Sequence, residues 1–360
     1  MVICRTPYRI SFFGGGTDYP SWYRLNGGAV LATSIDKYCY LTVRYLPPFF
    51  DHRYRIVYSR TELCKEISEI EHPAVRSIIG HLNFDRGLEI HHDGDLPSRS
   101  GVGSSSSFVV GLLNALYALR GQLRSKRELT MESIHIEQES MKESVGSQDQ
   151  TMAAYGGLNM VRFLTTGEIS VVPLPIPIPR MQELNRHFLL FFTGQQRTSS
   201  DLASSYAPTL ASKEEQMRRY MSMVEEAVRI VQSPDSLDGF GHLLDEAWQI
   251  KRKLSSLISN ESIDGIYSAA KSAGALGGKI IGAGGGGFIL FFVPPAAQQS
   301  VRSALRGLLE IPFKFESHGS QIIFIDREAD YASVEFQRGE KQIAGLQKVG
   351  ARPFLSNPGT

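Results

Sequence analysis

A loop rich in glycine and serine, LPSRSGVGSSSS (residues 96–107), lies between a predicted strand and a predicted helix. Gly101 and Gly103 allow the backbone to approach a ligand closely, because glycine lacks a Cβ atom. The serines fall where the helix begins, so free backbone amides and the helix dipole would face an anion there. The loop therefore indicates a phosphate site, although a flexible loop ending in a serine N-cap is the structural alternative.

The sequence contains neither a complete P-loop nor a dinucleotide-binding fingerprint in the required context. The nearest run to a P-loop ends at Gly278-Lys279-Ile280 and has Ala273 where the first glycine should be. A dinucleotide fingerprint matches formally at residues 282–287, but the strand-like residues 288–293 follow it where a helix is required. We interpret this glycine run as a tight strand–turn–strand, which either leaves room for a ligand or is structural.

Acidic residues suited to phosphoryl transfer follow the loop. This chemistry needs a metal ligand near the triphosphate and a carboxylate that orients the attacking hydroxyl. Glu137, on a predicted helix, and Asp149, in the turn GSQDQ (residues 146–150), could supply them. Glu139 and Glu143 are competitors on the same helix. Each carboxylate alone could equally be a solvated surface charge, and Asp149 could be an N-cap.

The N-terminal segment PYRISFFGGGTDYP (residues 7–20) ends a predicted strand with a glycine turn that carries Thr17 and Asp18. A turn of this kind is suited to binding hydroxyl groups, because an aspartate can accept hydrogen bonds from two neighbouring sugar hydroxyls. An Asx-type turn with no ligand is the alternative.

These residues must be positioned by a mixture of strands and helices. Strands are predicted at residues 1–13, 41–45, 54–58, 87–92 and 187–193, and helices at 108–119, 125–144, 213–232, 237–258 and 263–273. Residues 171–179 hold four prolines at every second position and are interpreted as an extended connector. Because strands and helices do not alternate strictly, we predict an α+β fold with two domains.

The bulk composition excludes several classes of protein. The 360 residues include 38 basic and 37 acidic side chains, whereas nucleic-acid and membrane partners usually require a basic excess. The three cysteines form no CxxC pair, which is typical of free thiols in a reducing compartment. No signal peptide and no apolar stretch long enough to span a bilayer is evident. We expect a cytoplasmic enzyme.

Taken in this order, the motifs resemble those of the GHMP kinase superfamily. PYRISFFGGGTDYP resembles the first motif of that family, SGVGSSSS its ATP loop, and KIIGAGGGGF (residues 279–288) its glycine-rich third motif. Within the family, GGGTD, VGSQDQTMAAYGG, TGQQRTSSDLA and HLLDEAWQIKRKLSSLIS are most similar to the bacterial kinases that act on D-glycero-D-manno-heptose 7-phosphate. The resemblance extends to about residue 345.

The resemblance implies two α/β domains with the active site in the cleft between them, and ATP and Mg²⁺ as cofactors. Asp149 matches the position of the family's catalytic aspartate, and Arg9 lies where a basic residue often supports that site. Ser105 and Glu137 match the family's ligands of Mg²⁺. The ATP loop would include Pro97, Gly101, Gly103, Ser104, Ser105 and Ser106. The acceptor would be bound by Gly15, Gly16, Thr17, Asp18, Arg197, Gly284, Gly285 and Gly286.

One departure from the family concerns the acceptor. Galactokinases carry Glu-His before the Thr-Asp of the first motif, where this chain has Gly15-Gly16. The loss of two bulky polar side chains should open room for a larger or phosphorylated sugar. A phosphorylated acceptor needs a cation for its phosphate, and Arg99, Lys142 and Arg197 are the candidates.

The expected function is transfer of the ATP γ-phosphoryl group to the anomeric hydroxyl of that sugar phosphate, giving a 1,7-bisphosphate for capsule or lipopolysaccharide synthesis. A kinase for free galactose or fucose, and a non-catalytic ATP and sugar sensor, are the alternatives. The partner is a small-molecule sugar phosphate, and the family leaves a homodimer open. Residues 1–175 and 180–345 are expected to form the two domains, and 346–360 a tail.

Overall fold

Two β-sheets organise the chain, and the computed structural model describes residues 1–195 and 212–326 of it. The order β13-β1-β2-β5-β3-β4 forms the path of the larger sheet, β6 and β12 pair with β2, and β7 pairs with β6. Its strands are β1 (Val2–Phe13), β2 (Gly28–Tyr45), β3 (Tyr54–Val57), β4 (Thr61–Cys64), β5 (Leu88–Gly94), β6 (Leu158–Phe163), β7 (Ile169–Pro173), β12 (Phe315–Glu316) and β13 (Gln321–Ile325). The smaller sheet, in the order β11-β8-β10-β9, contains β8 (Phe188–Phe192), β9 (Gly277–Ile280), β10 (Phe288–Phe292) and β11 (Leu309–Glu310).

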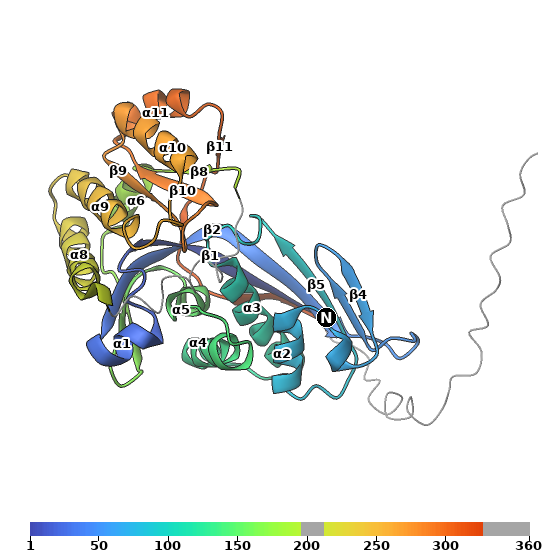
Figure 1. Cartoon of the computed structure of the whole chain (residues 1–360). Coiled ribbons are helices and arrows are strands. Elements are labelled where there is room, and N and C mark those ends of the chain that lie inside the picture. The colour runs from blue at the N-terminus through green and yellow to red at the C-terminus, as the bar shows by residue number, and fades with distance from the viewer. Residues whose placement is uncertain (196–211, 327–360) are drawn as a thin grey trace, which may run out of the picture.

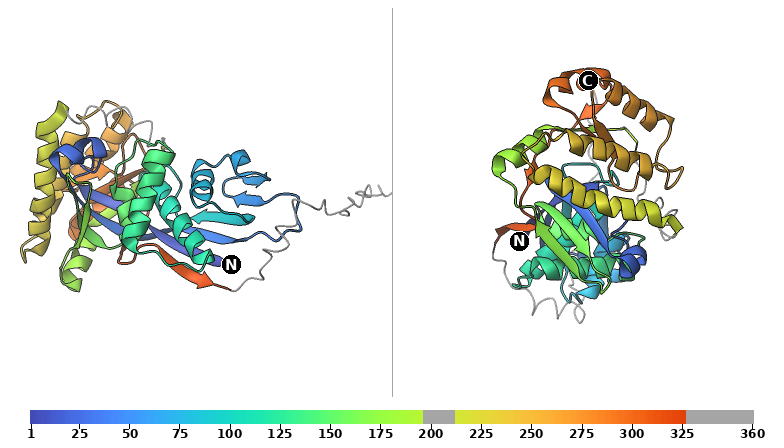
Figure 2. Two further views of the ribbon diagram at one scale, coloured as in Figure 1. Left: turned by 90° about the horizontal axis from the view of Figure 1, so that it is seen from below. Right: turned by 90° about the vertical axis from the view of Figure 1, so that its left-hand side faces the viewer.

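The helices fall into two groups around these sheets (Figure 1). Helices α2 to α5 lie along one face of the larger sheet, with α3 against β1 and β2, and α9 packs against β9 and β10. Figure 2 shows the smaller sheet and its helices at one end of the long β1–β2 pair. The helices are α1 (Pro20–Asn26), α2 (Pro73–His81), α3 (Ser104–Leu119), α4 (Lys126–His135), α5 (Gln148–Tyr155), α6 (Ile178–Arg186), α8 (Glu214–Gln232), α9 (Asp238–Lys251), α10 (Glu261–Ser272) and α11 (Gln298–Ala304), with short turns η1 (Ile67–Glu69), η2 (Ile136–Ser140) and η4 (Pro295–Ala297).

The two sheets meet through a cluster of phenylalanines. Phe12 of β1 stacks on Phe188 of β8 with ring centroids 5.0 Å apart, and Phe240 of α9 contacts both rings edge-on. Phe292 of β10 adds a further edge contact to Phe188. All four rings are buried. Aromatic pairs of this geometry add to the hydrophobic stabilisation of a core, so the cluster fixes the end of β1 against the smaller sheet.

The α+β fold predicted from the sequence is confirmed, and several element boundaries move. The strand expected at residues 41–45 is the end of an 18-residue strand, β2, and α3 begins at Ser104 instead of residue 108. Helix α4 does begin at the predicted capping box of Ser125 and Glu128, but it ends at His135 and continues as the π-helical turn η2. Helix α9 ends at Lys251, seven residues earlier than expected.

The expected second domain of residues 180–345 requires a correction. Strand β13 pairs antiparallel with β1, and β12 pairs with β2, so residues 315–325 belong to the larger sheet. The reason is that this pairing satisfies backbone groups of β1 that would otherwise form an exposed sheet edge. Residues 327–345 and the expected tail of 346–360 lie outside the described residues. We still propose a domain boundary near residues 175–180, ahead of the first strand of the smaller sheet.

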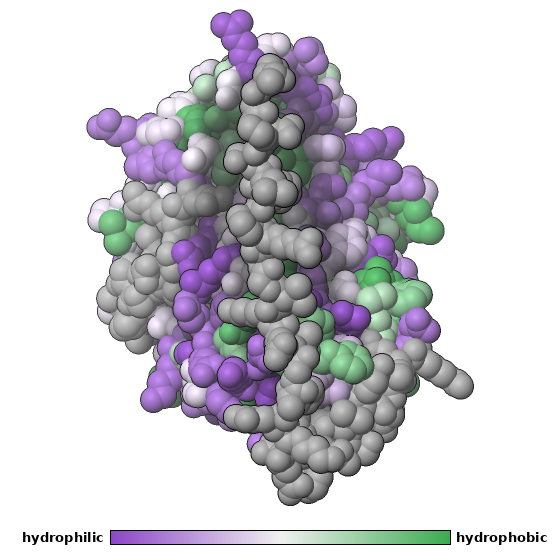
Figure 3. Space-filling model, turned by 90° about the vertical axis from the view of Figure 1, so that its right-hand side faces the viewer, coloured by the Kyte–Doolittle hydropathy of each residue, from purple (hydrophilic) through white to green (hydrophobic). Residues whose placement is uncertain are grey.

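The visible surface is mixed in character. Figure 3 shows hydrophilic side chains over much of one face, with hydrophobic residues in small groups between them. Within residues 1–195 and 212–326, no helix combines the length and the apolar character needed to cross a membrane.

Candidate active site

The glycine- and serine-rich loop connects β5 to the first turn of α3. Gly101 and Gly103 have φ angles of 87° and 76°, which disfavour residues with a side chain. A Cβ atom on Gly101 would lie 2.3 Å from the carbonyl oxygen of Ile281, so the loop touches the turn after β9. Gly103 is the N-cap of α3 and offers no capping side chain. The first amides of α3 are therefore available to an anion.

The serine that is hydrogen-bonded to the predicted metal-binding glutamate is Ser106, and the assignment of Ser105 as a ligand of Mg²⁺ stays a prediction. Ser105 is exposed, whereas the buried Ser106 hydroxyl donates a 2.9 Å hydrogen bond to Glu137 Oε2. Neighbouring residues of a helix point about 100° apart, which accounts for the different surroundings of these two serines. Glu137 itself lies in the π-helical turn η2, a feature frequent at functional sites.

Glu137 is fully buried and only partly satisfied. Gln150 Nε2 donates to its Oε2 atom, but Oε1 has no hydrogen-bond partner in the described part of the chain. Burial raises the pKa of Glu137 to about 8. No cluster of three or more acidic, histidine or cysteine side chains that could hold a metal occurs among the described residues. One carboxylate and one hydroxyl nevertheless fit Mg²⁺, which in kinases takes its remaining ligands from phosphates and water.

Asp149 and Arg9 form a two-point ion pair. The Nε atom of Arg9 donates to Asp149 Oδ1 at 2.7 Å, and Nη2 donates to Oδ2 at 2.6 Å. The remaining Arg9 nitrogen donates to the carbonyl oxygen of Gly101 at 2.5 Å. A Cβ atom on Gly103 would lie 3.4 Å from Asp149 Oδ2, so the carboxylate stands directly beside the phosphate loop. The structure thus brings the two predicted catalytic residues to the predicted nucleotide site.

Some residues of the glycine turn in the first motif border the active-site cavity, and one is buried in the core. Gly15, Gly16 and Asp18 border the cavity described below, but Thr17 is fully buried and does not. The Thr17 hydroxyl donates to the carbonyl oxygens of Gly14 and Ala29. The predicted contact of Thr17 with an acceptor is therefore wrong. Its hydroxyl holds the turn against β2 instead.

Asp18 links this turn to the segment that carries Asp149. Its Oδ1 atom accepts from the Gly16 amide at 2.9 Å, and its Oδ2 atom from the Gln148 amide at 3.3 Å. Burial, followed by the neighbouring Asp149 carboxylate, raises the pKa of Asp18 to about 6. Each carboxylate oxygen still has a free lone pair for a sugar hydroxyl.

The glycine-rich third motif forms the predicted strand–turn–strand between β9 and β10. Gly282 and Ala283 border the cavity, whereas Gly284, Gly285 and Gly286 do not. The Gly285 amide donates to the carbonyl oxygen of Ile258, and a Cβ atom on Gly286 would approach Gln195. The three predicted acceptor-binding glycines are thus packed against protein backbone. Predicted Arg197 lies outside the described residues.

A single cavity of about 970 Å³ connects these parts. It is bordered by predicted site residues from the first motif, the phosphate loop and α5, namely Arg9, Gly15, Gly16, Asp18, Gly101, Gly103, Ser104, Ser105, Ser106 and Asp149. Pro97 does not border it, although Ser98 and Arg99 do. The site therefore converges from segments far apart in the chain, and Arg9 and Asp149 alone are 140 residues apart.

Sequence reasoning missed several cationic residues that border this cavity, among them Lys251 and Lys279. Lys251 ends α9, and Lys279 lies within the buried strand β9. A lysine inside an otherwise glycine and isoleucine strand was the available signal, because lysine is rarely buried without a reason. Lys251 had no comparable signal in a helix rich in charged residues.

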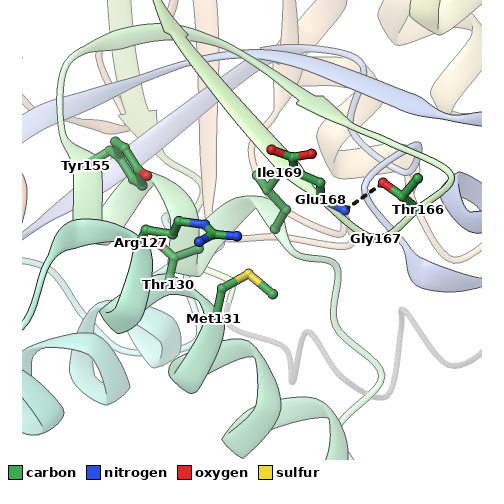
Figure 4. A pocket seen from close by; sticks show the side chains of 8 residues that line it. All are labelled: Arg127, Thr130, Met131, Tyr155, Thr166, Gly167, Glu168 and Ile169. Atoms are coloured by element: carbon green, nitrogen blue, oxygen red, sulfur yellow. Dashed lines mark hydrogen bonds between the residues drawn. The ribbon is translucent and has the colours of Figure 1, made fainter.

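A second cavity, of about 440 Å³, lies between α4 and the β6–β7 turn (Figure 4). Arg127, Tyr155 and Glu168 are among the residues that surround it, and the Glu168 amide donates to the Thr166 hydroxyl. None of the predicted catalytic or nucleotide-binding residues borders this cavity. The larger cavity is therefore the candidate active site.

Comparisons with known proteins identify the family of the chain. A family model of the GHMP kinases N terminal domain matches residues 56–157, and one of the GHMP kinases C terminal domain matches residues 223–310. A D-glycero-alpha-D-manno-heptose 7-phosphate kinase of Campylobacter jejuni is 28% identical over 294 residues, covering 78% of this chain and 86% of the relative. A galactokinase of Pyrococcus furiosus is 27% identical over 321 residues, covering 79% of this chain and 86% of the relative.

Solved structures show the same fold. A crystal structure described as a D-glycero-D-manno-heptose 1-phosphate kinase from Bacteroides thetaiotaomicron superposes with a TM-score of 0.75 at 25% identity, covering 91% of this chain and all of that one. A mevalonate kinase with 16% identity and a TM-score of 0.67 supports the fold alone. Because the two family models together match more than half of the 360 residues, the chain belongs to the GHMP kinases and is an ATP-dependent kinase.

Proposed function

We propose that the chain transfers the γ-phosphoryl group of ATP to the anomeric hydroxyl of D-glycero-D-manno-heptose 7-phosphate. The observation that carries the catalytic part is the placement of Asp149, which Arg9 holds at two points beside Gly103 of the phosphate loop. The heptose assignment is supported by the Campylobacter jejuni relative, whose name gives this substrate. The product, a 1,7-bisphosphate, would serve the synthesis of nucleotide-activated heptose for capsule or lipopolysaccharide.

Asp149 would orient the acceptor hydroxyl and take up its proton. In a loose transition state the bond to the leaving phosphate is largely broken before the hydroxyl loses its proton, so a carboxylate needs only to accept it late. Arg9 keeps both oxygens of Asp149 fixed, and its positive charge lies close to the phosphoryl group in transfer. The chain thus supplies orientation and charge stabilisation, which dominate this class of reaction.

The nucleotide phosphates would lie over the loop of residues 101–106, where the amides at the start of α3 can donate to them. Ser106 and Glu137 would hold Mg²⁺ through the hydroxyl and the unpaired Oε1 atom. Neutralisation of charge on the phosphate oxygens is the chemistry that bound Mg²⁺ supplies in such sites.

The acceptor would lie against the first-motif turn. Gly15 and Gly16 leave this side of the cavity without bulky side chains, and Asp18 presents a carboxylate there. Asp18 would bind sugar hydroxyls while it positions the segment of Asp149 through the Gln148 amide. A cavity of about 970 Å³ is at the upper end of the usual range for ligand pockets, as two substrates require.

Two other functions compete with this one. The galactokinase relative, and a bifunctional fucokinase of Arabidopsis thaliana that is 24% identical over 204 residues, favour a free sugar as acceptor. A non-catalytic sensor of ATP and sugar would also use this fold, but the paired Arg9 and Asp149 would then have no function in it.

A phosphorus NMR assay of ATP consumption separates these functions. The purified protein is incubated with Mg²⁺, ATP and either D-glycero-D-manno-heptose 7-phosphate, the free heptose, galactose or fucose. We expect a new anomeric phosphate resonance with the heptose 7-phosphate alone. Phosphorylation of free sugars only would replace the proposed acceptor, and ADP formation with none of the sugars would favour the sensor.

A further inference from the structure

Two lysines from the C-terminal half of the chain reach the same part of the active-site cavity. Lys279 of β9 donates from Nζ to the carbonyl oxygen of Phe12 at 2.9 Å. Lys251, at the end of α9, donates to the carbonyl oxygens of Ile280, at 3.2 Å, and Gly282. Both side chains border the cavity. Their ammonium groups therefore lie between the end of β1 and the glycine turn.

A positive charge at this position would have no counterion among the described residues. Lys279 is 7% exposed and Lys251 is partly buried, yet neither forms an ion pair within the part of the chain that the structure describes. The third cation nearby, Arg9, is already paired with Asp149. Burial, together with Arg9, lowers the pKa of Lys279 to about 7, and burial, Lys279 and Arg9 lower the pKa of Lys251 well below its ordinary value.

Unused hydrogen-bond donors accompany this charge. A lysine ammonium group has three N–H donors. Among the described residues, Lys279 uses one of them and Lys251 uses two. The pair therefore retains donors for a ligand. A buried cation without a counterion is costly, which an anionic ligand would relieve.

We infer that Lys251 and Lys279 bind the phosphate group that the sugar acceptor already carries before the reaction. This inference rests on the proposed function, since it requires a phosphorylated acceptor. It replaces the three cations considered from the sequence. Arg99 borders the cavity from the nucleotide loop, Lys142 does not border it, and Arg197 lies outside the described residues.

The position of the pair favours the acceptor over ATP. The nucleotide phosphates already have the loop amides, the start of α3 and the Ser106–Glu137 pair. Lys279 instead contacts the carbonyl oxygen of Phe12, which immediately precedes the Phe13–Asp18 segment on the acceptor side. Arg9 lies next to Asp149 and also close to the two lysines. An acceptor whose reactive hydroxyl faces Asp149 can therefore extend from there toward the lysines.

The test compares Lys279→Met and Lys251→Met with the control Lys253→Met, an exposed lysine two positions after the end of α9. Methionine retains an unbranched apolar chain but no charge. KM and kcat are measured for ATP, for heptose 7-phosphate and for the free heptose. Because a hydrogen bond to a charged group contributes about 1.5–3 kcal/mol, KM for the phosphorylated acceptor should rise about 10- to 100-fold. KM values for ATP and free heptose should change less than about 3-fold, as should all values for Lys253→Met.

Each result has a separate meaning. If kcat falls equally with both acceptors, or KM for ATP rises instead, the lysines serve the transferred phosphoryl group and the inference is wrong. If the wild-type protein uses heptose 7-phosphate and the variants are unaffected, the inference fails while the proposed function stands. If the wild-type protein uses a different sugar phosphate, and KM for that sugar phosphate rises in the two lysine variants, the inference stands and the heptose assignment fails. Use of free sugars alone overturns both.

A measurement on the wild-type protein remains decisive even if a variant does not fold. Isothermal titration calorimetry at pH 8 is carried out with heptose 7-phosphate and with free heptose, each in two buffers of different ionisation enthalpy. A phosphate that restores the charge of Lys279 requires proton uptake at this pH, because the pKa of Lys279 in the free protein is about 7. We expect proton uptake with the phosphorylated sugar only. Equal uptake with both sugars would contradict the inference.

Discussion

The Ser106 hydroxyl donates a 2.9 Å hydrogen bond to Glu137 Oε2, while Ser105, the preceding residue, is exposed. Ser106→Ala should therefore lower kcat about 10- to 100-fold, because it removes a bond to a charged group worth about 1.5–3 kcal/mol. It should also raise the Mg²⁺ concentration required for half-maximal activity. Ser105→Ala, at the residue that the family resemblance assigns to Mg²⁺, should lower kcat less than Ser106→Ala does. A larger loss in Ser105→Ala than in Ser106→Ala would reverse this assignment.

Asp149→Asn tests the proton acceptor. The amide preserves the shape of the side chain but cannot accept the hydroxyl proton, so kcat should fall about 10²- to 10⁴-fold. Binding of ATP, measured by calorimetry, should change little, because the phosphate loop is untouched. Turnover close to that of wild type would remove Asp149 from the proposed mechanism.

Asp18 should give the unfolding free energy a distinct pH dependence. The native state raises its pKa from 3.8 to about 6, so it holds a proton that the unfolded chain releases at lower pH. Its contribution to stability is thus fully present below about pH 3.8 and is lost as the pH rises through 6. Relative to Asp18→Asn, the wild type should lose up to about 3 kcal/mol between pH 4 and pH 7.

The measurement for Asp18 is chemical denaturation of both proteins across this pH range. Only the difference between their slopes counts, since the asparagine also weakens one of the two backbone hydrogen bonds at every pH. Parallel pH profiles would show that the Asp18 carboxyl group titrates normally in the folded protein.

Gly101→Ala tests the contact between the phosphate loop and the glycine turn. The new Cβ atom would lie 2.3 Å from the Ile281 carbonyl oxygen, and φ is 87°. Strain of this kind costs about 1–3 kcal/mol, and displacement of the loop should weaken ATP binding. Gly80→Ala is the control, because it lies within α2 with nothing within 4 Å of the new methyl group. That control should be stabilised by about 0.5–1 kcal/mol.

Thermal unfolding and ATP titration of the two glycine variants provide the readout. Loss of ATP affinity in Gly101→Ala, with unchanged affinity in Gly80→Ala, is the expected result. Equal stability of the Gly101→Ala variant and wild type would mean that the loop can move away from the turn without cost.

The sequence by itself determined the features that depend on local patterns. The strand–loop–helix context of residues 96–107, the capping box at Ser125 and the strand–turn–strand of the third motif all follow from residue types within a few positions. The ordered motifs also determined the family. Arg9 and Asp149, 140 residues apart, could be paired in advance only through that resemblance.

Only the tertiary structure decided which side chains reach the cavity. Ser105 and Ser106 both border the cavity and are equivalent by type, and the direction of α3 places the second beside Glu137. The Thr17 side chain does not border the cavity, because its hydroxyl is hydrogen-bonded to the carbonyl oxygens of Gly14 and Ala29. Lys251 and Lys279 meet at the end of β1 because the Phe12 cluster joins the two sheets there. Such contacts depend on packing between distant segments, which local sequence patterns do not encode.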